Sequence, residues 1–219
     1  MKRKIITTAD GSKTIQIEDW NEQYHSTHGA IQEAYHVFIK NGLSLFQDQG
    51  LAILEIGFGT GLNAFITFLE AEKFGLKITY NGVEAFPVKM EELALLDYSK
   101  ALNAEKFEPH YLKMHETSWG ALHEVSDNFR LLKRKMDFRD ISESEEYNLI
   151  YFDAFGSRVQ PELWTEEIFL AMYNALKVEG VLVTYAAKGA VRRAMQSVGF
   201  TVERLPGPPG KREMLRATK

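Results

Sequence analysis

The chain has 219 residues, of which 45% are hydrophobic and 26% are charged, values that suit one globular α/β domain better than two. It contains no cysteine, which excludes a disulfide framework and a thiolate metal site and makes a reducing cytoplasm the expected location. No run of about 18 apolar residues occurs and the first residues lack a signal-peptide core, so we expect no membrane partner.

The net charge of −4 is unevenly distributed along the chain. From Lys188 to Lys219, eight basic residues oppose two acidic ones and give a net charge of +6, so residues 1–187 carry −10. An acidic body with a basic end indicates a surface for a polyanion. A solvated basic tail would give the same composition, and both interpretations stay open.

The first 46 residues are predicted to form an extension to the main domain, which we place at residues 47–219. Weak alternation around Asp10 and Gly11 predicts a hairpin within residues 1–18. Residues 20–30 combine polar and aromatic side chains, as a binding loop or an ordinary helix entry would. Apolar positions on one face of residues 31–46 predict a helix packed on a sheet.

Residues 51–63 carry the central motif of the sequence. An apolar run that reaches Ile56 is followed by Gly57, Gly59 and Gly61 and then by a helical pattern, so it predicts strand, tight turn and helix. Glycine permits positive φ and close approach of a ligand, and the first N–H groups of the helix are unpaired. The motif therefore predicts a nucleotide-like cofactor.

Two cofactors fit this turn. Residues 59–64 satisfy the dinucleotide fingerprint G-x-G-x-x-G/A, in which backbone N–H groups hold a pyrophosphate. The longer frame from Glu55 through the three glycines is the pattern of S-adenosylmethionine (SAM) methyltransferases. SAM is cationic at its sulfonium and ammonium and has no phosphate, so a carboxylate at the mouth of the turn favours SAM and disfavours a pyrophosphate.

The strands that follow are predicted to end in acids. Residues 77–83 form the second strand, and Glu84 follows Gly61 by 23 residues, near the spacing at which an acid meets ribose hydroxyls. Pro87 then begins a helix to about residue 100. Residues 101–126 form an insertion whose histidines have no carboxylate arranged with them, so we expect no metal site.

Two further strand ends carry aspartates. Residues 129–136 form the third strand, and Asp137 after it either accepts from an adenine amino group or caps residues 138–141. Residues 147–152 form an aromatic-rich fourth strand that ends at Asp153. Ligands of open α/β sheets bind outside the carboxyl ends of the strands, so Asp153 is expected to face the reactive end of the cofactor.

The remaining chain completes an alternating pattern. We expect a helix from Pro161 to about residue 176, a strand at residues 181–186, a helix at 187–198, and two strands at 200–205 and 212–217 around a loop of prolines and glycines. The predicted fold is therefore α/β and Rossmann-like. It has a mostly parallel seven-stranded sheet, helices on both faces and a C-terminal antiparallel strand pair.

The ordered set of motifs resembles the wobble-uridine aminomethyl methyltransferase family, the methyltransferase half of the bifunctional MnmC-type tRNA enzymes. The resemblance spans nearly the whole chain and rests on residues 55–63, 84–87, 152–155 with 161–165, 191–193 and 211–215. It implies a class I methyltransferase fold and transfer of the SAM methyl group to the exocyclic amine of 5-aminomethyl-(2-thio)uridine in the tRNA anticodon loop.

The resemblance also implies roles for individual residues. Glu55, Gly57, Gly59 and Gly61 correspond to the methionine end of SAM, Glu84 to its ribose, Asp137 to its adenine, and Asp153 to the catalytic aspartate. Phe58 and Ala85 are further cofactor-binding positions. Residues 156–160 depart from the expected turn. The large enzymes of the family add a flavin oxidase domain, and because the sequence ends at Lys219 we expect a separate oxidase or amine-forming enzyme upstream.

The basic end would supply the tRNA contacts. Lys188, Arg192, Arg193, Lys211 and Arg212 are the candidate phosphate ligands, while Phe155 and Tyr185 fit a core position as well as a base-stacking one. Three alternatives remain open at this stage: a SAM methyltransferase for a small molecule or protein, a dinucleotide oxidoreductase, and a catalytically silent SAM- or RNA-binding protein.

Overall fold

The computed structural model describes residues 2–219 and contains two sheets. The larger has eight strands in the order β10-β11-β9-β8-β4-β5-β7-β6. Their bounds are β4 Gly50–Ile56, β5 Lys77–Val83, β6 Leu122–Ser126, β7 Phe129–Arg134, β8 Tyr147–Phe152, β9 Leu176–Thr184, β10 Thr201–Pro206 and β11 Glu213–Thr218. The centre of this sheet is parallel, from β9 through β8, β4 and β5 to β7.

The parallel strands are nearly continuous apolar runs because helices cover both faces of the sheet. One face packs Phe38, Phe65 and their neighbours, and the other packs Phe169, Met195 and theirs. The helices are α1 Ala30–Ala34, α2 Leu62–Ala71, α3 Met90–Leu93, α4 Tyr98–Ala101, α5 Glu108–Glu116, α6 Glu166–Ala175 and α7 Gly189–Ser197. Short 3-10 turns are η1 Glu18–Trp20, η3 Leu43–Leu45, η4 Glu72–Phe74, η5 Glu105–Phe107, η6 Phe138–Asp140 and η7 Pro161–Leu163.

The predicted α/β fold with a C-terminal antiparallel pair is confirmed, but the predicted number of strands is wrong by one. The additional strand, β6, lies antiparallel to β7 at the edge of the sheet and comes from the insertion at residues 101–126. Leu122 and Glu124 are exposed in β6 and only Val125 is buried, so an edge strand of this kind has little apolar alternation to reveal it.

Two predicted helices also differ from the structure. The helix expected from Pro87 to residue 100 is two short helices, α3 and α4, because Asp97 between them adopts a left-handed conformation with φ 56°. The helix expected at 31–46 begins as α1 and continues as the π-helix η2 Tyr35–Lys40. Its apolar face still packs on the sheet, with the Phe38 ring 4.9 Å from that of Tyr151.

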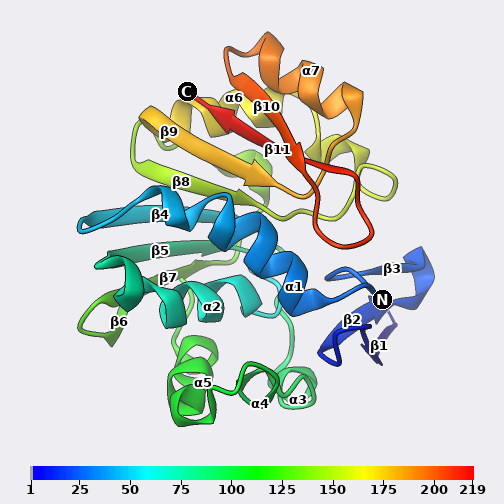
Figure 1. The fold of residues 1–219 in the computed structure, drawn as a ribbon, viewed down its shortest axis with the longest axis vertical. Coiled ribbons are helices and arrows are strands. Elements are labelled where there is room, and N and C mark those ends of the chain that lie inside the picture. The colour runs from blue at the N-terminus through cyan, green and yellow to red at the C-terminus, as the bar shows by residue number, and fades with distance from the viewer. Residues whose placement is uncertain (1) are drawn as a thin grey trace.

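The predicted N-terminal hairpin is confirmed as β1 Arg3–Thr7 and β2 Lys13–Ile17, to which β3 Glu22–Gln23 adds a third antiparallel strand. This small sheet lies beside the main sheet at the edge where the β9 arrowhead points (Figure 1). The boundary at residue 46 remains a prediction. Among residues 2–219, no helix combines the length and hydropathy needed to cross a membrane.

The packing of α6 predicts that truncating two adjacent residues changes the free energy of unfolding by very different amounts. Phe169 is fully buried against Phe152 at a ring separation of 5.2 Å, whereas Leu170 is 46% exposed. We expect Phe169→Ala to lower the free energy of unfolding by about 3–5 kcal/mol through the cavity it leaves. Leu170→Ala, the matched control, should change it by less than about 1 kcal/mol in urea denaturation. Equal losses in the two variants would contradict this packing.

Candidate active site

The turn after β4 is fixed by hydrogen bonds from neighbouring strands. The N–H groups of Gly57 and Phe58 donate to the Val83 carbonyl at 3.0 and 2.9 Å, and the Asp153 N–H donates to Ile56 at 2.9 Å. Gly57 has φ 91°, and a Cβ there would lie 2.7 Å from the Asp153 carbonyl oxygen. Only glycine therefore lets the turn touch the end of β8, which places Asp153 directly beside it.

A cavity of about 590 Å³ opens at the carboxyl ends of the parallel strands, and its volume lies within the range of small-molecule sites. Its walls come from the glycine turn, the ends of β5 and β8, the N-terminal loop and the loop between β10 and β11. The predicted cofactor and catalytic residues that line it are Gly57, Phe58, Gly59, Glu84, Ala85, Asp137 and Asp153. The strand-end acids therefore meet in one place.

Two residues predicted to contact the cofactor do not line the cavity. Gly61 has φ 71° and faces His115, whose Nε2 would lie 2.8 Å from a Cβ at this position. Glycine is therefore required at position 61, just before α2, by the positive φ and by close packing, while its direct contact with SAM stays a prediction.

Glu55 is the second residue that the structure places elsewhere. It lies beneath the turn with 1% exposure, and its Oε1 accepts from Asn63 Nδ2 at 2.9 Å. Burial raises the pKa of its carboxyl well above the usual value, with the nearby Asp153 adding to the rise. The Glu55 carboxyl therefore faces Asn63 beneath the turn and does not line the cavity, and its predicted contact with SAM stays a prediction.

Glu84 at the end of β5 closes one side of the turn. Its Oε2 accepts from the Gly59 N–H at 3.0 Å and its Oε1 from the Phe86 N–H at 2.8 Å. Burial raises the pKa of the carboxyl, and these backbone donors oppose the rise. Each oxygen has further acceptor capacity toward the cavity, as the predicted role with ribose hydroxyls requires.

Asp137 caps the 3-10 turn η6, one of the two roles that the sequence left open. Its Oδ1 accepts from the Arg139 N–H at 3.0 Å and from Arg139 Nε at 2.9 Å. These bonds to Arg139 hold the pKa of the carboxyl at about 2. Asp137 lines the cavity as well, beside Phe138, so the adenine role remains a prediction that the cap does not replace.

Asp153 is partly exposed and is oriented by Asn63, whose Nδ2 donates to its Oδ2 at 2.8 Å. The same amide nitrogen donates to Glu55, so it holds the two acids in a fixed relation. Burial raises the pKa of Asp153 well above its usual value, followed by the charge of Glu33, while Asn63 and Lys211 oppose the rise. A carboxyl with this environment suits a proton acceptor or a partner for a cation.

Glu33 and Lys211 form an ion pair in the wall of the same cavity. Glu33 comes from α1 and Lys211 from the loop between β10 and β11. Lys211 Nζ also lies 3.9 Å from the centroid of the Tyr185 ring, whose hydroxyl donates to Ala154 at 2.8 Å. The structure therefore turns Lys211 inward, and its predicted role as a tRNA phosphate contact is not supported by this placement.

Aromatic side chains form another part of the wall. The ring of Phe155 lies 5.6 Å from that of Trp20 and 5.0 Å from that of Tyr24, both edge-on. Phe155 and Tyr185 line the cavity and are only partly buried, so they are not ordinary core residues. The N-terminal loop at residues 20–28 supplies most of this wall, which agrees with the binding-loop interpretation.

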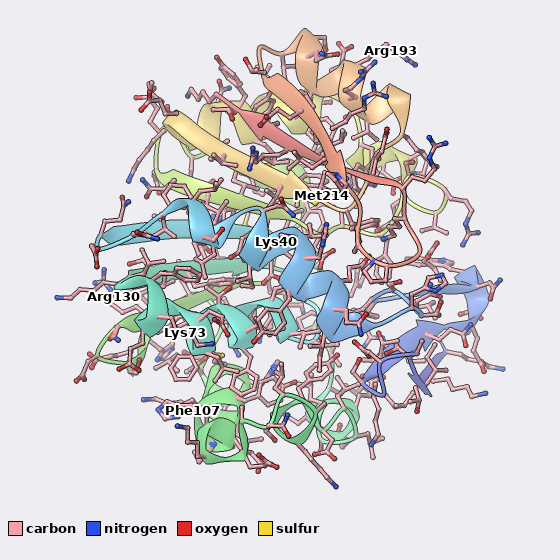
Figure 2. The ribbon with its side chains drawn as sticks, viewed as in Figure 1. Lys40, Lys73, Phe107, Arg130, Arg193 and Met214 are labelled. Carbon is pink, nitrogen blue, oxygen red and sulfur yellow. The ribbon has the colours of Figure 1, made fainter. Side chains whose placement is uncertain are left out.

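The other predicted tRNA contacts lie outside the cavity. Lys188, at the start of α7, donates to Ser157 Oγ at 3.0 Å, which places this end of α7 beside the rim formed by Gly156. Arg193 and Arg212 are exposed, and Arg192 is half-buried. Figure 2 shows Arg193 at the top of the molecule on α7, on the opposite side from Phe107. Several other basic residues of this end are paired with acids, such as Arg216 with Glu203 at 2.9 Å.

Sequence reasoning missed three of the polar residues that shape the site: Asn63, Glu33 and Lys211 in its inward role. Asn63 carried a readable signal, because it is the polar residue among the apolar ones that open α2. Glu33 has no local signal, since its partner is 178 positions away. Among residues 2–219, no cluster of three or more His, Cys, Asp or Glu side chains could hold a metal ion.

A sequence family described as S-adenosyl-L-methionine-dependent methyltransferase matches residues 102–219, more than half of the chain. The chain belongs to this family. SAM is therefore its cofactor, and of the two cofactors that fit the glycine turn the dinucleotide is excluded. The conclusion drawn from the longer glycine frame, that the cofactor is SAM, is confirmed.

Several curated relatives of this methyltransferase share the name tRNA 5-methylaminomethyl-2-thiouridine biosynthesis bifunctional protein MnmC. The relative from Leptospira borgpetersenii serovar Hardjo-bovis is 31% identical over an alignment of 218 residues. The alignment covers 90% of this chain and 32% of that protein. The relative from Pseudoalteromonas translucida is 26% identical over 226 residues, covering 91% and 34%. The chain spans about a third of the length of the curated relatives it matches.

Solved structures agree with the fold. MNMC2 from Aquifex aeolicus superposes with a TM-score of 0.75 at 23% identity, covering 99% of this chain and 69% of that one. Spermidine synthase from Thermotoga maritima gives a TM-score of 0.55 at 12% identity, covering 99% and 68%. At these identities the likeness concerns the architecture alone.

The residues present fit SAM. Gly57 and Gly59 leave bare backbone along one wall, Glu84 lies where ribose hydroxyls would meet a carboxylate, and Asp153 is available for the cationic end. The methyl donor would thus extend from Asp137 past Glu84 toward Asp153, in the order that these strand ends follow along the sheet.

The contacts of Glu84 predict a specific loss of cofactor affinity. Glu84→Ala removes the ribose acceptor and leaves the buried Gly59 N–H without its partner, so we expect the Kd for SAM to rise by about 10–100-fold. Isothermal titration calorimetry measures this directly. Glu116→Ala, at an exposed position of α5, is the control and should bind as the wild type does. If Glu84→Ala bound SAM with unchanged affinity, Glu84 would not be a cofactor contact.

Proposed function

We propose that this methyltransferase transfers a methyl group from SAM to the exocyclic primary amine of 5-aminomethyl-(2-thio)uridine at the wobble position of tRNA. The observation that carries the proposal is Asp153, a carboxyl held by Asn63 at 2.8 Å, beside the glycine turn and inside the cofactor cavity. We take the substrate from the name of the MnmC relatives, which are longer proteins than this chain.

The charges in the cavity favour an amine as the methyl acceptor. Asp153 lines the wall beside the turn, and a carboxylate there attracts a cationic group. A primary amine has a pKa near that of lysine, about 10, so it arrives as an ammonium ion. Asp153 would bind this ammonium and orient the nitrogen toward the methyl donor.

Asp153 and water together remove one proton from the substrate amine. Loss of one proton frees the lone pair of the amine, and Asp153 is placed to accept that proton and pass it to water. When bound, SAM would supply an activated methyl group for this lone pair, with a neutral thioether as the leaving group. Asn63 keeps the Asp153 carboxylate aimed while this happens.

The aromatic wall supports a nucleobase as the carrier of the amine. Trp20, Tyr24 and Phe155 lie together on the side of the cavity formed by the N-terminal loop. A single-stranded base that leaves its stack is held in proteins by aromatic faces. A wobble uridine turned out of the anticodon loop would meet this wall with its aminomethyl group directed at Asp153.

Basic residues beside the cavity support tRNA as the partner. Lys188, Arg192, Arg193 and Arg212 belong to the start of α7 and to the loop before β11, on the side where Ser157 bonds Lys188. They would neutralise phosphates of the anticodon stem and loop. A tRNA substrate also implies action in the cytoplasm and a separate enzyme, an oxidase or another amine-forming activity, that prepares the aminomethyl group.

Replacement of Asp153 tests the catalytic assignment. We expect Asp153→Asn to reduce methyl transfer to tRNA carrying 5-aminomethyl-2-thiouridine by at least about 100-fold, because the variant cannot accept a proton or pair with an ammonium ion. SAM affinity should change little. Transfer of labelled methyl measures the first quantity and calorimetry the second. Near-normal transfer by Asp153→Asn would refute the role of Asp153.

The basic surface predicts salt-dependent binding of tRNA. We expect the double variant Arg192→Ala, Arg193→Ala to bind tRNA about tenfold more weakly at low salt. The slope of log affinity against log salt should fall by roughly one to two units. Lys100→Ala, an exposed position on α4, is the control. Filter binding at several salt concentrations gives both values, and an unchanged slope in the double variant would show that α7 does not contact phosphate.

A further inference from the structure

We propose that Lys211, held in the cavity by Glu33, keeps the bound substrate amine deprotonated, so that the two residues move the pH dependence of methyl transfer in opposite directions. The inference rests on the proposed function and deepens it, because it assigns to this ion pair the removal of the ammonium charge. Asp153 binds and orients the nitrogen, and Lys211 makes that nitrogen a nucleophile.

Lys211 is fixed inside the cavity by two contacts. Its ammonium pairs with Glu33 Oε1 and lies 3.9 Å from the centroid of the Tyr185 ring. The second oxygen of Glu33 accepts from the Ser26 N–H at 2.8 Å, which holds the carboxylate in turn. The side chains are 31% and 9% exposed, so neither charge is free in solvent. An exposed lysine would instead be mobile and screened.

The loop that carries Lys211 is anchored on the N-terminal side of the cavity. His36 Nε2 lies 2.8 Å from the Pro206 carbonyl oxygen, and Gly210 packs so closely on His28 that a Cβ there would lie 2.1 Å from its ring. The Lys211 N–H also donates to Pro208 at 2.9 Å. In Figure 1 this red loop descends from β10 and β11 toward the N-terminal sheet. The position of the cation is therefore built into the fold.

The ion pair shares its cavity with the proposed position of the substrate nitrogen. Asp153, Glu33 and Lys211 all line this cavity, and the proposed function places the reacting nitrogen at Asp153. Both Glu33 and Lys211 act electrostatically on Asp153, the first raising and the second lowering its pKa. A group bound at Asp153 experiences the same two charges.

A neighbouring ammonium ion lowers the pKa of an amine, because two like charges disfavour protonation of both. Lys211 therefore promotes loss of a proton from the substrate ammonium ion to Asp153 and then to water, which leaves a neutral amine. Glu33 works in the other direction, since its negative charge stabilises the ammonium form. With both charges present, the cavity still attracts the incoming ammonium ion, and the bound amine can still lose a proton and react.

The other ionisable groups around this position are common to every variant. Those that line the cavity are Asp153, Tyr185, Glu22, Tyr24, His25, His28, Glu84, Asp137, Arg139 and Glu162. Glu55 lies beneath the turn and shares the Asn63 amide with Asp153. Burial, and then the charge of Asp153, raises the pKa of Tyr185 well above its usual value, so Tyr185 stays neutral. Glu22 is paired with Arg158 at 2.8 Å. These groups shift all profiles alike.

The test compares pH profiles of methyl transfer under single-turnover conditions, with enzyme in excess over tRNA that carries 5-aminomethyl-2-thiouridine and with saturating SAM, from about pH 6 to 9.5. We expect Lys211→Met to move the midpoint of the profile upward by about one pH unit or more and to slow transfer about tenfold at pH 7. Glu33→Gln should move the midpoint downward. Lys211→Arg should keep the wild-type midpoint.

The control is Lys40→Met, an exposed lysine at the end of η2 (Figure 2) that does not line the cavity, and its midpoint should equal that of the wild type. Coincident midpoints for wild type and Lys211→Met, or a Lys211→Met enzyme that binds SAM but is inactive at every pH, would overturn the inference. If Glu33→Gln fails to fold, the Lys211 variants alone decide. A wild-type enzyme that leaves this tRNA unmethylated would refute the proposed function and the inference together.

Discussion

The site depends on one close approach, that of the glycine turn after β4 to the end of β8. Gly57 has no side chain, so its backbone meets the Asp153 carbonyl at a distance that any Cβ would forbid. The same step brings Asn63, at the start of α2, within hydrogen-bonding distance of the Asp153 carboxylate. The cofactor turn and the proposed catalytic acid follow two paired strands, β4 and β8, whose facing residues such as Ile53 and Leu149 are 96 positions apart. Parallel sheets bring such residues together at the carboxyl ends of their strands.

The site also contains several buried ionisable side chains. Glu55, Glu84 and Asp153 all have their pKa raised by desolvation, and each is held by at least one hydrogen-bond donor from the chain. Such groups cost stability unless they are paired, so their accumulation at one edge of the sheet indicates function more than folding. Glu33 and Lys211 add an ion pair to this edge and connect the N-terminal extension with the C-terminal strands.

The sequence predicted the strands better than the site. β5 and β8 have the predicted bounds because they are apolar runs ended by acids, while β6 escaped prediction as a mostly exposed edge strand. Glu84 and Asp153 were placed by strand ends alone. The directions of the Glu55 and Lys211 side chains were not predicted, because they depend on contacts with Asn63 and Glu33. The second of these contacts spans 178 positions. Local patterns carry no information about such pairs.

The central claim is that this cavity methylates an amine on a tRNA base. The most direct measurement is mass spectrometry of nucleosides from tRNA that carries 5-aminomethyl-2-thiouridine, after incubation with the protein and SAM. The account predicts that this nucleoside gains the mass of one methyl group, on its exocyclic nitrogen, and that other nucleosides are unchanged. An unmodified 5-aminomethyl-2-thiouridine with SAM bound to the protein would contradict it.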